Sequence, residues 1–417
     1  MAKVLVTNAS DRAALAVIRS LGRRGVDVIA AESFGFSTGA LSKYCGHRIL
    51  CPPPERDRST FIKWLLHFVK RENLDLLIPV NDFTALPISE YKEDFEKYVK
   101  VATPKYEVAM RAFDKIQTFR IATEQGIPTP KTYVVEGQES IKRLGKELSY
   151  PIVIKPRMKV NWVNERAIVQ KITLRNYAYN ETDLIDKYRE ISVSMQNSGI
   201  KDGLPFLQEC IRGDAFGAEA LMSRQSPRAL FAHKRLREYP ITGGASTLRE
   251  SVRAERIVEL GVQLLKSMEW TGVAMVEFKV DKKDNQPKLI EVNGRMWGSL
   301  ALAINAGVDF PYLLYRVMAK EEDLFPMPYR IGVQQRWLLP GDILWLLSSI
   351  LSSSNKLVPI KEFLKAFAVK DDIVSLTDPA PLCGAVMDML KDGIDVLTHR
   401  RSIEGETILP RAERYVT

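Results

Sequence analysis

The amino-acid sequence predicts an α/β protein that begins with a parallel-sheet domain. Three observations support this fold class: strand-like and helix-like segments alternate over the first hundred residues, the length allows two or three domains, and the composition is that of a globular protein. The chain has 417 residues, of which 46% are hydrophobic and 27% charged. These values exclude a disordered or collagen-like chain.

The first predicted unit, residues 1–104, is an α/β domain. Strands that alternate with helices favour a parallel sheet with helices covering its faces. The predicted elements are a strand at Lys3–Thr7, a helix behind it, and then a strand at 26–31, a helix at 61–69 and a strand at 74–80. The turn at residues 8–11 lacks the glycine-rich dinucleotide fingerprint, so a nicotinamide-binding domain is not predicted.

The second predicted unit covers residues 105–325 and mixes strands with helices. One helical stripe covers 106–125 and stops at Gly126, and residues 257–265 have the clearest amphipathic spacing in the chain. Further strands are predicted at 132–135, 151–155 and 206–211, and a helix lies within 173–203.

The net charge and the cysteine content indicate which ligands and which cellular compartment to expect. Sixty basic residues against 51 acidic ones give a net charge of +9, which weakly favours anionic ligands or an anionic surface. The four cysteines form no C-x-x-C pair, and the four histidines are scattered, so neither a zinc site nor a disulfide framework is expected. No secretory signal is visible at the N-terminus, so we expect a cytoplasmic protein. We expect small-molecule substrates and no nucleic-acid partner.

The most specific signal is a predicted hairpin in which two strands, 273–280 and 288–293, flank a polar loop. If the pairing is symmetric about Asp284, Glu277 lies opposite Glu291, and Asn293 shares the face of Glu291. Opposed carboxylates about 5 Å apart repel each other unless a cation compensates. Such oxygen donors suit Mg²⁺ or Mn²⁺ rather than zinc. The alternative is a solvated hairpin face with ordinary surface acids.

Basic residues supply a second signal. Lys155 ends a buried strand, where an unpaired charge is costly, so an anionic partner is expected. Lys115 lies on the helix before Gly126, and Lys234 lies in a basic run that precedes the glycine pair 243–244. Taken singly, each lysine also fits an ordinary surface position.

In this order the motifs resemble the ATP-grasp superfamily, and within it the carboxylate–amine ligase-like members. The resemblance covers about residues 105–320. The motifs are a lysine before G-I-P-T-P, then P-I-V-I-K-P, L-Q-E-C-I-x-G-D, H-K-R-L-R-E-Y-P-x-x-G-G, V-E-F-K and L-I-E-V-N-G-R-M-W-G-S. The α/β unit before them resembles the domain that usually precedes an ATP-grasp core.

The resemblance implies a role for each matching residue. Lys115 and Lys155 would bind ATP phosphates, and Asp214 would bond the ribose hydroxyls. Glu277, Glu291 and Asn293 would hold one or two Mg²⁺ ions. The hinge that reads adenine would be Gln208, Glu209, Cys210 and Ile211, through the backbone of Glu209 and Ile211. Lys234 and Arg295 would neutralise the γ-phosphate and a developing acyl phosphate, and the loop at Gly243 and Gly244 would close near the acceptor.

One segment departs from the family pattern. Members usually carry a glycine-rich loop over the phosphates, but residues 157–164 contain no glycine. Backbone conformations with positive φ are costly without glycine. Either Arg157 or Lys159 then supplies side-chain donors, or the loop moves differently.

The resemblance implies an ATP-dependent ligase that activates a small carboxylate as an acyl phosphate and joins it to an amine. Three alternatives stay open: a small-molecule kinase, a carboxylase acting on bicarbonate, and a non-catalytic nucleotide-binding protein. The oligomeric state is also open, with a homodimer as one alternative.

Residues 326–417 form a third, mostly helical predicted unit. The apolar run 343–351 is about half the ~20 residues that a membrane-spanning helix needs. Lys356, Lys361, Lys365 and Lys370 follow it. The favoured interpretation is a helical cap packed on the core. The alternative is an apolar face beside lysines that lies on an anionic membrane or grips a lipid-linked acceptor.

Overall fold

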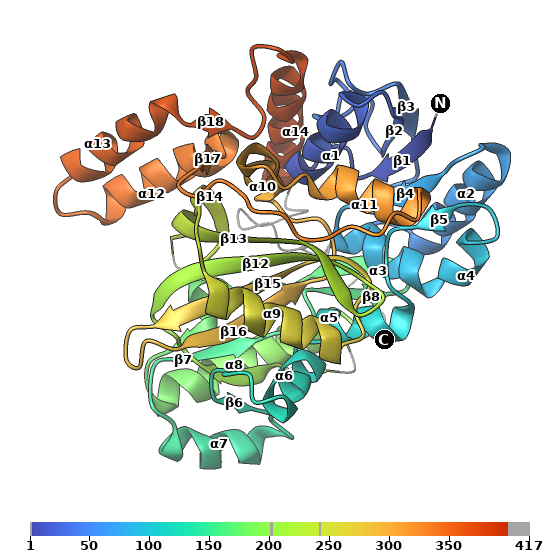
Figure 1. Cartoon of the computed structure of the whole chain (residues 1–417). Helices are drawn as coiled ribbons and strands as arrows, with labels where there is room; N and C mark the ends of the chain where they lie inside the picture. Colours follow the sequence, from blue (N-terminus) through green and yellow to red (C-terminus); the bar gives the residue numbers. More distant parts are fainter. Residues whose placement is uncertain (1, 201–202, 242, 399–417) are drawn as a thin grey trace.

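The N-terminal unit is a five-stranded parallel sheet, as the sequence predicts (Figure 1). The computed structural model of the chain describes residues 2–200, 203–241 and 243–398. The strand order is β3-β2-β1-β4-β5, and helices cover both faces, so the middle residues of the central strands are apolar and buried. The elements are β1 (Lys3–Thr7), α1 (Arg12–Gly22), β2 (Asp27–Glu32), β3 (His47–Leu50), α2 (Arg58–Arg71), β4 (Leu76–Ile78), α3 (Asp82–Glu90), α4 (Lys92–Phe95) and β5 (Lys100–Val101).

A small four-stranded sheet with its helices follows, at the bottom of Figure 1. Its strand order is β10-β7-β11-β6. The elements are α5 (Tyr106–Phe113), α6 (Lys115–Glu124), β6 (Thr132–Tyr133), α7 (Gln138–Glu147), β7 (Ile152–Lys155), β10 (Tyr177–Ala178), α8 (Glu181–Asn197) and β11 (Phe206–Glu209). The predicted stripe at 106–125 is two helices, because Asp114 has extended backbone and its side chain caps α6 by accepting from the Ile116 N–H.

The third part is a seven-stranded sheet of order β16-β15-β12-β13-β14-β17-β18. The predicted amphipathic helix is α9, whose apolar stripe packs on this sheet. The elements are β12 (Gly213–Ser223), β13 (Ser226–Tyr239), β14 (Ala245–Ser251), α9 (Glu255–Ser267), β15 (Gly272–Asp281), β16 (Pro287–Asn293), α10 (Leu300–Ala306) and α11 (Phe310–Ala319).

Residues 326–398 are mostly helical but also extend this sheet. Strand β17 (Gln334–Arg336) pairs with β14, and β18 (Lys370–Asp371) pairs with β17. Between them α12 (Ile343–Ser352) and α13 (Leu357–Lys365) project away from the body, whereas α14 (Ala380–Leu397) lies beside α1 (Figure 1). None of the helices in the described part of the chain has the length and apolar character that a membrane crossing requires.

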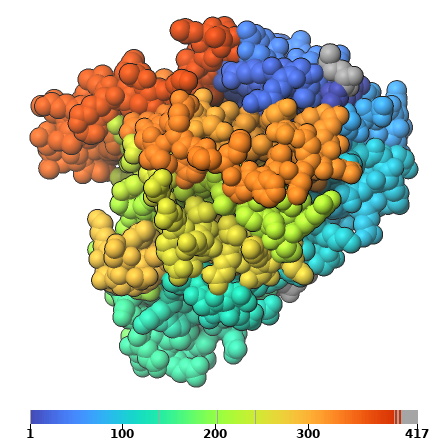
Figure 2. Space-filling view, viewed as in Figure 1, coloured from blue at the N-terminus to red at the C-terminus, as the bar shows by residue number. Residues whose placement is uncertain are grey.

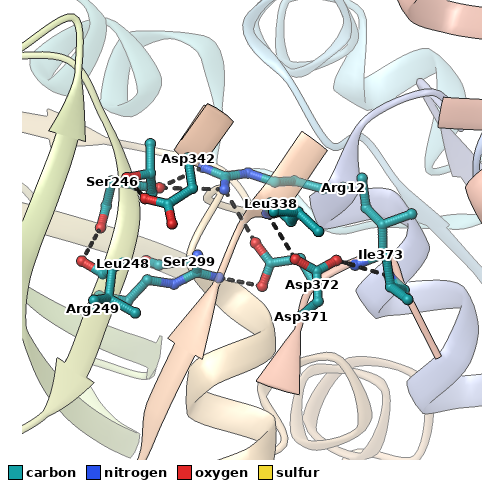
Figure 3. Close-up of polar contacts among 12 residues, drawn as sticks. Arg12, Ser246, Leu248, Arg249, Ser299, Leu338, Asp342, Asp371, Asp372 and Ile373 are labelled. Atoms are coloured by element: carbon teal, nitrogen blue, oxygen red, sulfur yellow. Dashed lines mark hydrogen bonds and ion pairs between the residues drawn. The ribbon is translucent and has the colours of Figure 1, made fainter. Parts of the chain in front are cut away.

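A buried charge cluster fastens this C-terminal segment to the other two parts (Figure 3). Asp372 pairs with two arginines. Arg12 of the N-terminal unit is 3.1 Å away, and the second partner is Arg249 of the central sheet. Arg12 also donates to the Ser246 carbonyl at 3.3 Å. Asp371 caps the turn after β18 by accepting the Ile373 N–H at 2.8 Å. The three parts therefore meet at one carboxylate, which is 1% exposed.

Candidate active site

The predicted carboxylate pair exists in the structure. Strands β15 and β16 pair antiparallel, with Glu277 directly opposite Glu291, and the register shifts by one residue between Glu277 and Phe278. Asn293 lies on the same face, and its amide nitrogen is 2.9 Å from Glu277 and 3.4 Å from Glu291. The hairpin therefore presents two carboxylates and one amide from a single face of the sheet.

Cations from three different elements surround this face. Arg235 of β13 is paired with Glu277 and, at 3.3 Å, with Glu238. Lys115, the first residue of α6, reaches Glu291 at 4.0 Å. Lys155 ends β7 and is only 7% exposed. The predicted phosphate lysines therefore lie on the same side of the molecule as the predicted metal ligands.

The electrostatics of these groups follow from burial and from their neighbours. Burial, reinforced by the charge of Lys115, lowers the pKa of Lys155 to about 8. Burial raises the pKa of Glu277, and the opposing charge of Arg235 only partly offsets this effect. Burial would also raise the pKa of Glu291, but Lys115 and its neighbouring lysines outweigh it and lower that pKa. The two carboxylates thus differ in proton affinity although they face each other.

Asp82 brings the N-terminal unit into the site. It is the first residue of α3 and accepts from Arg295 at 3.0 Å and from Lys159 at 2.8 Å. Burial alone would raise the pKa of Asp82, but the charges of Arg295 and Lys159 dominate and lower it. Arg295 follows the end of β16, so the carboxylate of Asp82 bridges the N-terminal unit and the central sheet. A pocket beside it is lined by Asp82, Ala112, Phe113, Lys115, Met158, Lys159, Val160, Glu291, Val292, Asn293 and Gly294.

The glycine-free segment is a β-hairpin formed by β8 (Val160–Val163) and β9 (Arg166–Val169). Its turn residues, Asn164 and Glu165, adopt the positive φ angles of 47° and 64° that glycine would favour. Hydrogen bonds hold the hairpin against the N-terminal unit: the Arg58 N–H donates to the Glu165 carbonyl at 2.9 Å, and the Arg58 guanidinium pairs with the Glu165 carboxylate at 3.1 Å. The segment thus forms an ordered flap that lines the pocket through Met158, Lys159 and Val160.

The two side chains proposed as phosphate donors in this flap have other partners. Arg157 pairs with Asp114 through two hydrogen bonds of 2.8 and 2.6 Å. Lys159 is bonded to Asp82, at the pocket itself. Of the two, only Lys159 lines the pocket, so it is the better placed to meet an anion there.

Comparison with known proteins identifies the fold. The sequence model of the family described as "ATP-grasp in the biosynthetic pathway with Ter operon" matches residues 222–338. The biotin carboxylase domain of a Hydrogenobacter thermophilus 2-oxoglutarate carboxylase, solved with MgADP, superposes with a TM-score of 0.63 at 18% identity, covering 80% of this chain and 73% of that one. The chain has the ATP-grasp fold. An L-amino acid ligase from Bacillus licheniformis has the same fold, with a TM-score of 0.58 at 16% identity over 77% of this chain and 74% of that one.

Two curated ligases are similar in sequence to this ATP-grasp chain. D-aspartate ligase of Enterococcus faecium is 25% identical over 249 residues, which cover 56% of this chain and 58% of that protein. D-alanine–D-alanine ligase of Pelotomaculum thermopropionicum is 26% identical over 235 residues, covering 50% of this chain and 67% of that protein. The match to D-aspartate ligase thus spans little more than half the length of either chain.

Within the ATP-grasp fold, the predicted hinge connects the small sheet to the central one. Gln208 is buried on β11, and its side-chain nitrogen donates to the Thr132 hydroxyl at 2.9 Å. Glu209 and Cys210 follow it, and Ile211 leads towards β12, where Asp214 lies. The roles of these residues towards adenine and ribose stay predictions.

Lys234 points away from the carboxylate pair. Its ammonium group pairs with Asp214 at 2.5 Å, and its cross-strand neighbours are Phe216 and then Phe278 in the core. Because successive residues of a strand face opposite sides, the next residue, Arg235, reaches Glu277. Arg235 also donates to the Gly244 carbonyl at 3.3 Å, so the predicted Gly243–Gly244 loop does lie beside the site.

The residues present fit a magnesium ion by their chemistry. Within the described residues, no three His, Cys, Asp or Glu side chains gather closely enough to hold a metal. The site instead offers the carboxylates of Glu277 and Glu291 and the side-chain amide of Asn293. The amide nitrogen of Asn293 faces Glu277, and a half-turn of the amide group would present its oxygen to a metal instead. Hard oxygen donors of this kind suit Mg²⁺, which keeps several water or phosphate ligands of its own.

Two site residues, Asp82 and Arg235, were not predicted from the sequence. Asp82 follows β4 at the carboxyl end of a parallel sheet, where such folds bind ligands, and this rule could have singled it out. Arg235 lies beside the predicted Lys234, and only the cross-strand register determines which side chain faces Glu277: Gly217 of β12 pairs with both Glu277 and His233, so Arg235, two residues after His233, shares their face.

Proposed function

We propose that this ATP-grasp protein is an ATP-dependent ligase that joins a small carboxylate to an amine and releases ADP and phosphate. One observation carries the proposal: a single face holds Glu277, Glu291 and Asn293 with Lys115 and Lys155 beside them. A site that only bound nucleotide would not need two opposed carboxylates. The similarity to two ligases that form carboxylate–amine bonds supports the same reaction class.

The proposed reaction has two steps. A carboxylate oxygen of the substrate attacks the γ-phosphorus of ATP, the bond to the bridging oxygen breaks, and ADP leaves. The amine then attacks the acyl carbon, phosphate leaves, and the amine loses a proton to solvent. Each step moves negative charge between oxygens, so positioned cations supply most of the catalysis.

Named residues would carry these roles. Lys115 and Lys155 would hold the phosphates, and Arg295 would stabilise charge on the transferred phosphoryl group once Asp82 releases it. Lys234 lies on the opposite face of β13, so Arg235, which contacts Glu277, is the better candidate for the cation role predicted for Lys234. A bound Mg²⁺, held by Glu277, Glu291 and Asn293, would neutralise phosphate oxygens.

The names of the relatives suggest the substrate class. D-aspartate ligase and D-alanine–D-alanine ligase both act on the amino acids that their names state. We therefore propose an amino acid as one of the two substrates. A small-molecule acceptor and a lipid-linked acceptor both stay open as the other.

A screen for ADP release tests the proposal. The purified full chain is incubated with ATP, Mg²⁺ and pools of amino acids, including D-aspartate and D-alanine, and ADP is measured by a coupled assay. Hydroxylamine is added in parallel, because only an acyl phosphate is trapped as a hydroxamate. Substrate-dependent ADP release with hydroxamate formation is expected, and Glu291→Gln should lack both.

Other outcomes identify the alternatives. ADP release without hydroxamate, together with a stable phosphorylated product, indicates a kinase. ADP release that depends on bicarbonate indicates a carboxylase. Tight ATP binding without any ADP release across all pools indicates a non-catalytic binding protein. Any of these three results overturns the ligase proposal.

A further inference from the structure

The two helices between β17 and β18 form a projecting arm, which we define as residues 343–370. Helices α12 and α13 pack on each other but leave the body of the molecule (Figure 1). In the space-filling view the same segment forms a separate lobe (Figure 2). None of the ten residues of α12 is buried, although the sequence ILWLLSSILS is strongly apolar. An apolar helix without a buried face needs a further explanation.

The base of the arm is fixed to the central sheet. Asp342, which is fully buried, accepts from Arg336 at 2.7 Å and from Arg237 at 3.0 Å. The Arg237 guanidinium lies 4.3 Å from the ring of Trp345, and that of Arg336 lies 4.2 Å from the ring of Phe363. The arm therefore has a defined orientation, and its outer residues are held in solvent by a rigid attachment.

Large apolar side chains line the outer part of the arm. Leu351 at the end of α12 is 86% exposed, Leu357 at the start of α13 is 63% exposed, and Phe367 is 70% exposed. Further exposed residues of the arm are Leu347, Val358, Ile360 and Leu364. Neighbouring exposed side chains of this size are unusual on a surface that faces only water.

Lysines border this apolar face. At about 100° per residue, Leu357, Ile360 and Leu364 fall within one side of α13, and Lys361 and Lys365 fall along its edge. Lys356 and Lys370 lie at the two ends of the helical segment, and all four lysines are exposed. The only acid in the arm is Glu362, which pairs with Lys365 at 2.6 Å, so the arm carries four positive charges and one negative.

We propose that this arm docks the protein on an anionic lipid surface. Leucine and phenylalanine side chains would enter the boundary between headgroups and acyl chains, while the bordering lysines contact anionic headgroups. Charge complementarity favours this occupant over a second copy of the chain, because two facing arms would bring their lysines together. The proposal is independent of the ligase reaction, since no residue of the arm lines the pocket.

Vesicle flotation of the full-length protein tests the proposal. Vesicles of phosphatidylcholine with phosphatidylglycerol are compared with phosphatidylcholine alone, at low and high salt. We expect binding to the anionic vesicles that weakens as salt screens the charges. Lys356→Glu with Lys361→Glu should lower the partition coefficient by at least about tenfold, since each lysine near an anionic surface contributes substantially. Leu351→Glu with Leu357→Glu should lower it by a similar factor, because the apolar contact is lost.

Matched variants elsewhere separate the arm from general charge. Lys142→Glu with Lys146→Glu changes the charge equally on exposed positions of α7, far from the arm, and Leu50→Glu changes an equally exposed leucine. These controls should float like the parent protein and have the same melting temperature. The absence of binding to anionic vesicles at low salt overturns the proposal. So does a self-association, seen by light scattering, that the arm variants abolish, because the arm is then an interface between copies or with another protein.

Discussion

The candidate active site and the C-terminal junction are both built from cations and carboxylates, yet their charges are arranged differently. At the junction opposite charges alternate, with Asp372 between Arg12 and Arg249. In the site, Arg235 and Lys115 pair with the two carboxylates, but like charges also adjoin: Glu277 faces Glu291, and the charge of Lys115 acts on Lys155. Adjoining like charges are unfavourable in an empty protein and become favourable only with a ligand of opposite charge. The comparison therefore distinguishes the junction, whose charges hold parts of the protein together, from the candidate site, whose charges suit a bound ligand.

The largest expected effect is on the site. Glu291→Gln removes one of two opposed charges while keeping the shape, so ATP turnover should fall by about 10²- to 10³-fold, as when a positioned electrostatic group is lost. The melting temperature should stay the same or rise slightly. Coupled ADP release and differential scanning fluorimetry measure the two effects. Glu139→Gln, an exposed residue of α7, is the control. Normal turnover in Glu291→Gln would show that the carboxylate face is a surface feature.

The next largest effect is expected at the junction, where a substitution should lower stability and leave nucleotide binding unchanged. Asp372→Asn leaves Arg12 and Arg249 buried without their shared carboxylate, which should cost about 3–5 kcal/mol of unfolding free energy. Chemical denaturation measures the loss, with Asp94→Asn at a surface pair as control. Below the melting transition, Mg-ADP affinity should match the parent protein. A large loss of nucleotide affinity without loss of stability would place the junction in the binding machinery instead.

The third prediction concerns Lys155 and its lowered pKa. Lys155→Ala should weaken ATP binding about ten- to a hundredfold, the range for a charge-assisted contact. Because the pKa of Lys155 is about 8 in the free protein, the lysine is charged below that pH and must gain a proton to bind phosphate above it. ATP affinity of the parent protein should therefore be level below pH 8 and fall above it.

Calorimetry at several pH values checks both parts of this prediction. The Lys155→Ala variant should lose the fall in affinity above pH 8, and Lys146→Ala, at an exposed position of α7, should keep it. Unchanged ATP affinity in Lys155→Ala would mean that the nucleotide binds elsewhere.

The sequence predicted the elements whose signals are local. The pairing of Glu277 with Glu291 agrees with the predicted hairpin, although a register shift between Glu277 and Phe278 contributes to it. The parallel N-terminal sheet follows from alternating strands and helices. The apolar stripe of α9 was likewise visible in its spacing. These features need only the period of a strand or helix, which neighbouring residues already contain.

Features that depend on distant residues were not predicted. Asp82 and Arg295 are 213 positions apart in the sequence, and no local sequence pattern predicts that they form a pair. The choice of Arg235 over Lys234 depends on the register of β13 against β12 and of β12 against β15, which joins strands distant in sequence. The extension of the central sheet by β17 and β18, in a mostly helical segment, was also not predicted. Strands of two or three residues are too short to show the alternating pattern of a strand.

The smallest expected effect concerns Asp82, which combines features of both clusters. Like Asp372 it pairs with two cations, Arg295 and Lys159, but it lines the pocket, where a phosphate would compete for the same cations. Asp82→Asn should therefore tighten ATP binding by about three- to tenfold, roughly the Coulomb energy of one partly exposed charge. The variant should also be less stable without nucleotide and recover with it, because ATP phosphates replace the missing carboxylate. Calorimetry and thermal melts with and without ATP measure both effects, and Asp94→Asn is again the control. Weaker ATP binding in Asp82→Asn would instead show that Asp82 holds Arg295 in its working position, as Asp372 holds the arginines of the junction.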